Sequence, residues 1–86
     1  MTITKQTVAD KIAAYLRHDI SLAELVDWAE QAMIDGEFAE DQASTLSAVI
    51  SRIGVADVRA FGLTWEDCEQ LLGQLGYTAR VDIIAA

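Results

Sequence analysis

The sequence predicts an all-α fold, a small bundle of four to five short helices that could end in a β-strand at about 77–84. The first sign is a capping box, in which Ser21 accepts from the third helical amide and Glu24 reaches back to the cap amide. The second is a weaker box of the same kind at Thr64 and Asp67. The third is the recurrence of apolar residues at helical spacing around these boxes. We therefore expect a single helical domain over residues 1–86.

The helix that begins at Leu22 is the best defined of the expected elements. Ile20 and Leu25 lie just before the cap and at the fourth helical position, as in a hydrophobic staple. Gly36 is expected to end the helix in the left-handed conformation. At about 100° per residue, one side of this helix gathers an apolar stripe that we expect to face the core. The stripe consists of Leu22, Leu25, Val26, Ala29, Ala32 and Met33.

The opposite side of this helix is acidic but carries two large apolar residues. Ile34 lies among the acids and Trp28 lies at their border. One interpretation is a recognition face, in which these two side chains anchor a partner and the carboxylates steer it. The other is that Trp28 covers the rim of the core and Ile34 is a single exposed apolar residue. The candidate protein-binding residues are Glu24, Asp27, Trp28, Glu30, Ile34 and Asp35.

Two further helices are expected on either side of this one. Thr4 can cap a helix of about Lys5 to His18, whose last turn would place Arg17 and His18 at the negative end of the helix dipole. A third helix is expected over about 40–53, with acids in its first turn. One side of it is formed by small residues that would let another backbone approach closely: Ser44, Ser47, Ala48 and Ser51.

The C-terminal third is expected to contain a short helix over 55–61 and a longer one from Trp65 to Leu75, followed by a segment of different period. Over 77–84, apolar and polar residues alternate, which is typical of a strand. A strand needs a neighbour, which residues 1–4 could supply within the chain or the same segment of a second copy could supply between chains. The alternative is a frayed tail that covers the bundle with Val81 and Ile83.

The charge of the chain restricts the class of partner. Fourteen acids against six Lys and Arg give a net charge of −8, and eight of the acids lie between Arg17 and Arg52, where no Lys or Arg occurs. Such a field repels phosphates and anionic lipid, so we expect neither nucleic acid nor a membrane as partner. No apolar run approaches the roughly 20 residues that span a bilayer, and no secretion signal is recognisable, which favours a cytoplasmic protein.

The residue types that carry most enzyme chemistry are scarce. The one histidine and the one cysteine leave His18 and Cys68 as the only thiol–imidazole pair, and Cys68 is expected in the core while His18 ends another helix. Ligands for zinc are too few, the acids near Gly36 lack the order of a calcium loop, and no glycine-rich phosphate loop occurs. We therefore expect a non-enzymatic protein without catalytic residues, metal site or cofactor.

Two stretches resemble known families. The run Asp19, Ile20, Ser21, Leu22, with an acidic helix behind it, resembles the Asp-Ser-Leu motif of acyl carrier proteins, and the resemblance implies a prosthetic group on Ser21. Here Ile20 separates Asp19 from Ser21, and the long first loop of that family is absent. The segment 55–75 resembles a helix-turn-helix in outline, but its second helix has no Lys or Arg to contact DNA.

In size, acidity and helix content, the chain is similar to bacterial immunity proteins and antitoxins, which bind basic nuclease toxins. This resemblance implies a protein-interaction module that binds and neutralises or regulates a basic protein such as a toxin or nuclease. Two alternatives remain open. One is a structural homodimer joined through the segment 77–84 or the small-residue side of the third helix, and the other is a carrier protein modified at Ser21.

Overall fold

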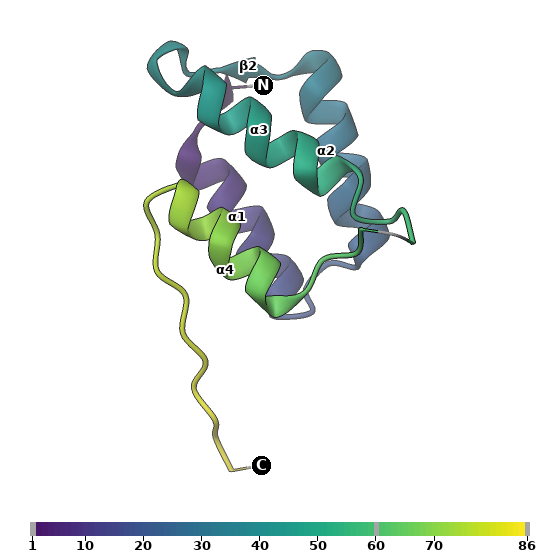
Figure 1. The fold of residues 1–86 in the computed structure, drawn as a ribbon, viewed down its shortest axis with the longest axis vertical. Coiled ribbons are helices and arrows are strands. Elements are labelled where there is room, and N and C mark those ends of the chain that lie inside the picture. The colour runs from purple at the N-terminus through teal and green to yellow at the C-terminus, as the bar shows by residue number, and fades with distance from the viewer. Residues whose placement is uncertain (1, 60, 86) are drawn as a thin grey trace.

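Residues 2–59 and 61–85 are described by a computed structural model, in which four α-helices pack as a bundle (Figure 1). The predicted all-α fold class is confirmed, with a parallel sheet of two very short strands added to it. In chain order the elements are β1 (Thr2–Ile3), α1 (Lys5–Leu16), α2 (Leu22–Asp35), β2 (Glu37–Phe38), the 3-10 helix η1 (Glu40–Gln42), α3 (Ala43–Gly54) and α4 (Trp65–Gln74).

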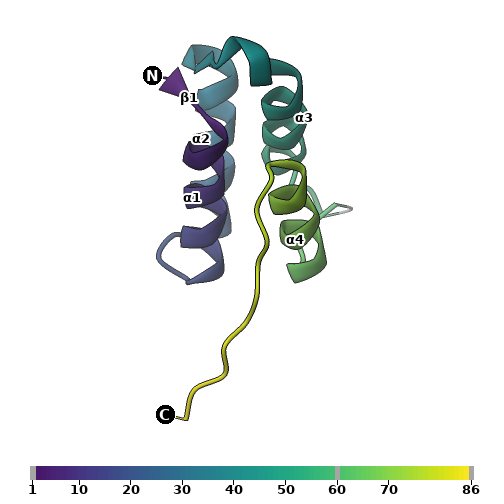
Figure 2. The ribbon, with the colours of Figure 1, turned by 90° about the vertical axis from the view of Figure 1, so that its left-hand side faces the viewer.

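The helices enclose one hydrophobic core. Figure 2 shows α1 and α2 on one side of the molecule and α3 and α4 on the other. The most extensive contact between helices is that of α2 with α3. Within the described ranges, no helix combines the length and apolar character needed to cross a membrane. The large, fully buried side chains include Ile3, Ile12, Leu25, Leu46, Ile50 and Ile53.

The helix starts follow the predicted capping signals. The amide of Glu24 donates to Oγ of Ser21 at 3.1 Å, and the amide of Ser21 donates to Oε1 of Glu24 at 3.1 Å. Thr64 and Asp67 make the same exchange, so an aspartate completes this box as well as a glutamate would. Thr4 caps α1 as predicted and forms a further box. Each box satisfies amides that a helix leaves without an internal partner.

Gly36 ends α2 for a different reason from the one predicted. Its φ is −74°, so the backbone is extended there rather than left-handed. The constraint is space, because a Cβ on Gly36 would meet the carbonyl oxygen of Ala32 and lie 2.9 Å from Cγ1 of Ile3. This close approach lets the chain pass directly into β2, which pairs in parallel with β1 and places Phe38 opposite Ile3. The small sheet thereby holds Ile3 in the core.

The two helix boundaries that differ most from the prediction do so by less than one turn. Helix α1 ends at Leu16, because the chain turns at His18 with a φ of 64°. His18 therefore lies between α1 and α2 and is not part of a last helical turn. Helix α3 begins at Ala43, because the three residues before it form η1. The small-residue side of α3 is exposed at Ser44, Ala48 and Ser51.

The prediction of a short helix over 55–61 was wrong, because none of the described residues of that segment is helical. Residue 60 lies outside the described residues. The chain instead makes successive turns, in which the amides of Ala56, Val58 and Phe61 donate to carbonyls three residues earlier at 3.0, 3.0 and 2.9 Å. So short a segment forms too few hydrogen bonds to offset the cost of nucleating an α-helix. The helix-turn-helix outline is therefore absent.

The strand predicted at 77–84 is not formed within this chain. The amide of Tyr77 donates to the carbonyl of Leu72 at 2.9 Å, and the residues from Thr78 to Ala85 make no backbone hydrogen bond with the rest of the described chain. The candidate neighbour, β1, is two residues long and pairs with β2 instead. The segment runs extended beside α1 and α4 and passes beyond the end of the bundle (Figures 1 and 2).

Replacing Gly36 by alanine is expected to lower the free energy of unfolding by about 1–3 kcal/mol, because the new methyl group would overpack α2 against Ile3. Gly73 provides the matched control. An added Cβ there meets nothing within 4 Å, so Gly73→Ala should raise the unfolding free energy by about 0.5–1 kcal/mol through helix propensity. Urea unfolding measures both changes, and a change of the same sign in both variants would contradict the close approach at Gly36.

Candidate functional site

All six candidate binding residues lie on α2, and the structure separates the two apolar ones. Trp28 and Ile34 lie about 120° apart around the helix axis, Ile34 among the acids and Trp28 at their border with the core side. The buried side of α2, from which both are excluded, is formed by Leu25, Val26, Ala29 and Ala32.

Trp28 borders the core and already has a partner within the chain. Its side chain is half-buried and packs against the core. The ammonium nitrogen of Lys11, on α1, lies 5.8 Å from the centroid of its ring. A cation at this distance is attracted by the electron-rich face of an indole. Trp28 thus helps to join α1 to α2, in keeping with the rim-covering interpretation.

Ile34, the other apolar candidate, has 76% of its surface exposed to solvent. Met33, which was predicted in the core stripe, is 47% exposed. That prediction was wrong although Met33 lies on the same side of α2 as the buried Val26. Met33 is two turns further along, in the last turn of α2, where that side is no longer covered. Ile34 and Met33 together present apolar surface in the last turn of α2.

The four candidate carboxylates are exposed, but two of them have partners within the chain. Glu24 accepts a hydrogen bond from the amide of Ser21, and Asp35 accepts one from the side chain of Gln31. For Asp27 and Glu30, the described residues provide no hydrogen bond or ion pair to the side chain. Glu30 and Asp27 lie about one and two turns before Ile34 on the same side of the helix. We call Asp27, Glu30, Met33 and Ile34 the α2 face.

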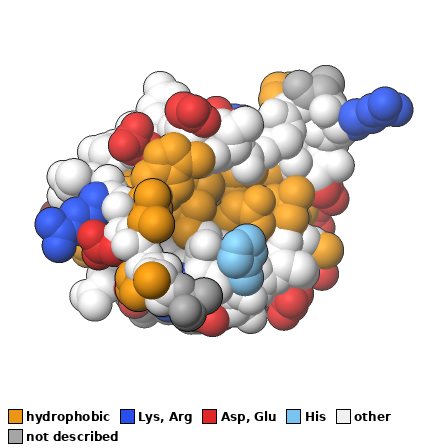
Figure 3. Space-filling model, turned by 90° about the horizontal axis from the view of Figure 1, so that it is seen from below, with side chains coloured by type: hydrophobic (Ala, Val, Ile, Leu, Met, Phe, Trp, Pro, Cys, Tyr) orange, Lys and Arg blue, Asp and Glu red, His pale blue; other side chains and the backbone are white. Residues whose placement is uncertain are grey.

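A second apolar surface was not predicted. Figure 3 shows hydrophobic side chains gathered across the end of the bundle, beside the pale blue side chain of His18. Tyr15, Leu16 and Leu63 pack against the core, yet each remains partly exposed. The surface arises only where α1 ends beside the start of α4, so no spacing within one helix reveals it. The surface contains a shallow hollow. The residues that line the hollow are Tyr15, Leu16, His18, Leu63, Thr64 and Trp65.

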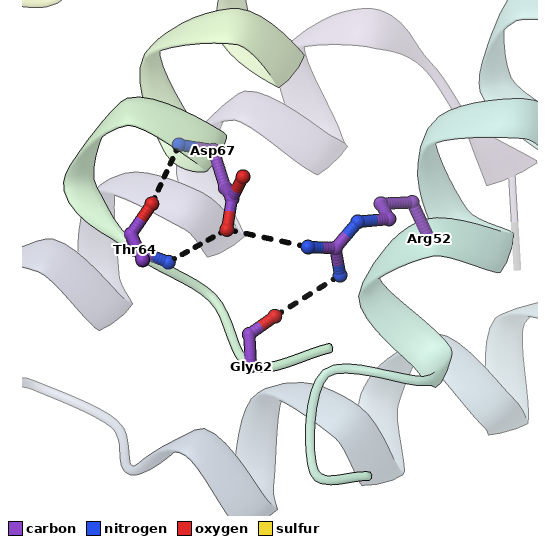
Figure 4. Close-up of polar contacts among 4 residues, drawn as sticks. All are labelled: Arg52, Gly62, Thr64 and Asp67. Atoms are coloured by element: carbon purple, nitrogen blue, oxygen red, sulfur yellow. Dashed lines mark hydrogen bonds and ion pairs between the residues drawn. The ribbon is translucent and has the colours of Figure 1, made fainter. Parts of the chain in front are cut away.

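Arg52 joins α3, the loop after it and α4 (Figure 4). Its Nη1 donates to the carbonyl oxygen of Gly62 at 3.1 Å, and its Nη2 donates to Oδ2 of Asp67 at 3.2 Å. The guanidinium also lies 5.9 Å from the ring centroid of Phe61. The pKa of Asp67 is held below its usual value, chiefly by the backbone amide of Thr64 and further by the Thr64 hydroxyl and the charge of Arg52. These contacts fix the start of α4.

Cys68 and His18 have surroundings that differ sharply. Cys68 is fully buried, whereas His18 is exposed in the turn between α1 and α2. Burial, and then the charge of Asp67, raises the pKa of the Cys68 thiol to about 11, so little thiolate forms near neutral pH. Over residues 2–59 and 61–85, no three His, Cys, Asp or Glu side chains are grouped so that they could hold a metal ion.

Ser21, the residue that the carrier-protein resemblance singles out, is the N-cap of α2. Its hydroxyl oxygen accepts the amide of Glu24 at 3.1 Å, and the residue is exposed. This hydrogen bond accounts for a serine at the position without any attached group.

No protein-family model, no curated protein and no solved structure matches the chain. The fold and the α2 face therefore define a class rather than a family. The class is a small, acidic helical bundle that exposes apolar side chains next to free carboxylates on one helix.

Substituting Asp67 by asparagine is expected to lower the unfolding free energy near pH 7 and to have less effect as the pH falls. The pKa of Asp67 is lower in the folded chain than in the unfolded one. Its stabilisation is therefore present above the usual carboxyl pKa of about 3.9 and is lost as the pH falls through the folded value. Urea unfolding at pH 7, 5 and 3 measures the difference between the two proteins.

Glu69→Gln is the matched control, because Glu69 is an exposed carboxylate on the same helix that makes no hydrogen bond or ion pair with the described residues. Its effect near pH 7 should be smaller than that of Asp67→Asn. A difference between wild type and Asp67→Asn that stays constant from pH 7 to pH 3 would contradict the role of the charged carboxylate.

Proposed function

We propose that the chain is a non-enzymatic protein-interaction module that binds a basic protein through the α2 face. The main support for this function is the exposure of Ile34, an apolar side chain on a helix whose other side is fully buried. Asp27 and Glu30 lie beside it with their carboxylates free of partners in the described chain. Protein interfaces favour such an apolar centre inside a polar or charged rim.

The charge distribution supports a basic partner. Of the eight acids between Arg17 and Arg52, seven lie in α2, β2 and η1 and one, Asp19, lies in the turn before α2, and no Lys or Arg interrupts them. A field of one sign attracts a cationic surface from a distance and raises the association rate. A basic nuclease or toxin is a partner of this kind, because the surface with which it binds phosphates would bind these carboxylates as well.

The charged and apolar residues of the α2 face have different tasks in this proposal. Asp27 and Glu30 lie in the rim, where charges chiefly set the association rate and its dependence on salt. Ile34 and Met33 supply the surface that loses water on binding, so they chiefly set the dissociation rate. Trp28 supports the face from within, through its contacts with the core and Lys11.

The double substitution Asp27→Lys, Glu30→Lys is expected to abolish retention of a basic protein that the wild type retains. The two proteins serve as paired baits in an affinity purification from the native host. Asp57→Lys with Glu69→Lys is the control, because it makes the same change of net charge at exposed acids outside α2. Circular dichroism confirms that each bait is folded. Retention of the same proteins by wild type and by the α2 variant would contradict the proposal.

The substitution Ile34→Ala is expected to raise the dissociation rate of the captured partner by roughly tenfold and to leave the association rate nearly unchanged. Because Ile34 is exposed, the unfolding free energy should change by less than about 0.5 kcal/mol. Ile84→Ala removes the same atoms from an exposed residue outside the α2 face and is the control. Surface plasmon resonance measures both rates, and equal dissociation rates for the two variants would argue against Ile34 as an anchor.

A further inference from the structure

The segment Thr78–Ile84, here called the tail, offers an interaction surface that is separate from the α2 face. It is extended and makes no backbone hydrogen bond with the rest of the described chain. Val81, Ile83 and Ile84 are 63%, 96% and 84% exposed. An extended backbone with free amides and carbonyls is a template for pairing with another strand.

The sequence of the tail is complementary to itself in one antiparallel register. When Val81 lies opposite Val81 of a second copy, Arg80 of each copy lies opposite Asp82 of the other. Residues opposite each other project from the same face of an antiparallel ribbon. One face then carries two Arg–Asp pairs, and the other carries Ala79, Val81 and Ile83 from both copies.

The charges disfavour the neighbouring registers. A slip of two residues in one direction places Arg80 opposite Arg80, and a slip in the other direction places Asp82 opposite Asp82. A slip of one residue places Val81 opposite a charged residue and mixes the two faces. The favoured register has two-fold symmetry, which is the condition for an interface between two identical chains.

The bundle provides a surface to cover the apolar face of such a ribbon. The tail begins along a groove of about 590 Å³ between α1 and α4. Ala79 packs against the core at this groove and Val81, on the same face of the tail, lines it, whereas Ile83 lies beyond it and is exposed. In the favoured register, Ile83 of the second copy lies opposite Ala79 and is brought to the same groove. The helical residues that line the groove include Ala9, Ala13, Leu16, Trp65 and Leu72.

We propose that the protein forms a symmetric homodimer in which the two tails pair antiparallel about Val81. Each tail exchanges main-chain hydrogen bonds with its mate, and the groove of each copy covers apolar residues of the other. A two-stranded ribbon by itself is only marginally stable in water, so burial against the groove supplies the additional stabilisation. The dimer uses no residue of the α2 face, and its existence is independent of the proposed function.

Analytical ultracentrifugation of the full chain and of a chain truncated after Tyr77 tests the dimer. The full chain is expected to be a dimer at micromolar concentration and the truncated chain a monomer. Arg80→Asp and Asp82→Arg should each weaken dimerisation by roughly tenfold, because each replaces two attractive pairs by two repulsive ones. The double exchange Arg80→Asp, Asp82→Arg should restore the wild-type affinity. An equimolar mixture of the two single variants should form a heterodimer.

A monomeric full chain would overturn the proposal, and so would single variants that dimerise as tightly as the wild type. Cysteine cross-linking checks the register separately. Val81→Cys should form a disulfide with its own mate on oxidation, because the two residues lie opposite each other across the symmetry axis. Thr78→Cys, which the register places opposite Ile84, is the control and should cross-link poorly. The native Cys68 is buried and does not interfere. Equal cross-linking of the two variants would exclude the register about Val81.

Discussion

The position of α4 depends on Arg52, whose guanidinium holds the end of α3, the loop after it and the first turn of α4 together. The Asp67 carboxylate that Arg52 contacts also accepts a hydrogen bond from the amide of Thr64. The Asp67 side chain therefore both caps α4 and joins it to α3. Hydrogen bonds between charged groups are stronger than those between neutral ones. With its start fixed, α4 can bury Cys68 and Leu71 in the core and send the tail back along α1. The groove and the apolar end of the bundle both follow from this placement.

The surfaces available for binding are those that the core does not require. Helix α2 is buried by α3 on one side and leaves Ile34 exposed on the other, so that side can be occupied by a partner without disturbing the packing. The residues of the tail that follow Ala79 likewise lie outside the core. The two surfaces could reinforce each other. A dimer paired through its tails would present two α2 faces, and a partner with two basic sites would then bind with higher avidity than either face alone provides.

Local signals predicted the starts of α1, α2 and α4 correctly, because a capping box such as that of Ser21 is a contact between residues three apart in the chain. Features that depend on distant residues could not be predicted in this way. Position 36 needs a glycine because Ile3, which is distant in sequence, packs against it. Trp28 contacts α1 through Lys11, whose ammonium group lies over the indole ring. The alternation in the tail was recognised, but whether it forms a strand depends on a neighbour that the chain itself does not supply. The candidate binding residues lie on one helix, as the sequence predicted, while their division into exposed and internally engaged groups required the fold.

We propose that the α2 face binds a basic protein, and methyl NMR is the direct test of this binding. Isoleucine and methionine methyl groups are labelled, and their signals are followed as the captured partner is added. We expect the signals of Ile34 and Met33 to change, while those of Ile83 and Ile84 keep the positions that they have in the free protein. Changes confined to Ile83 and Ile84, with Ile34 unaffected, would contradict the claim and assign the binding of the partner to the tail.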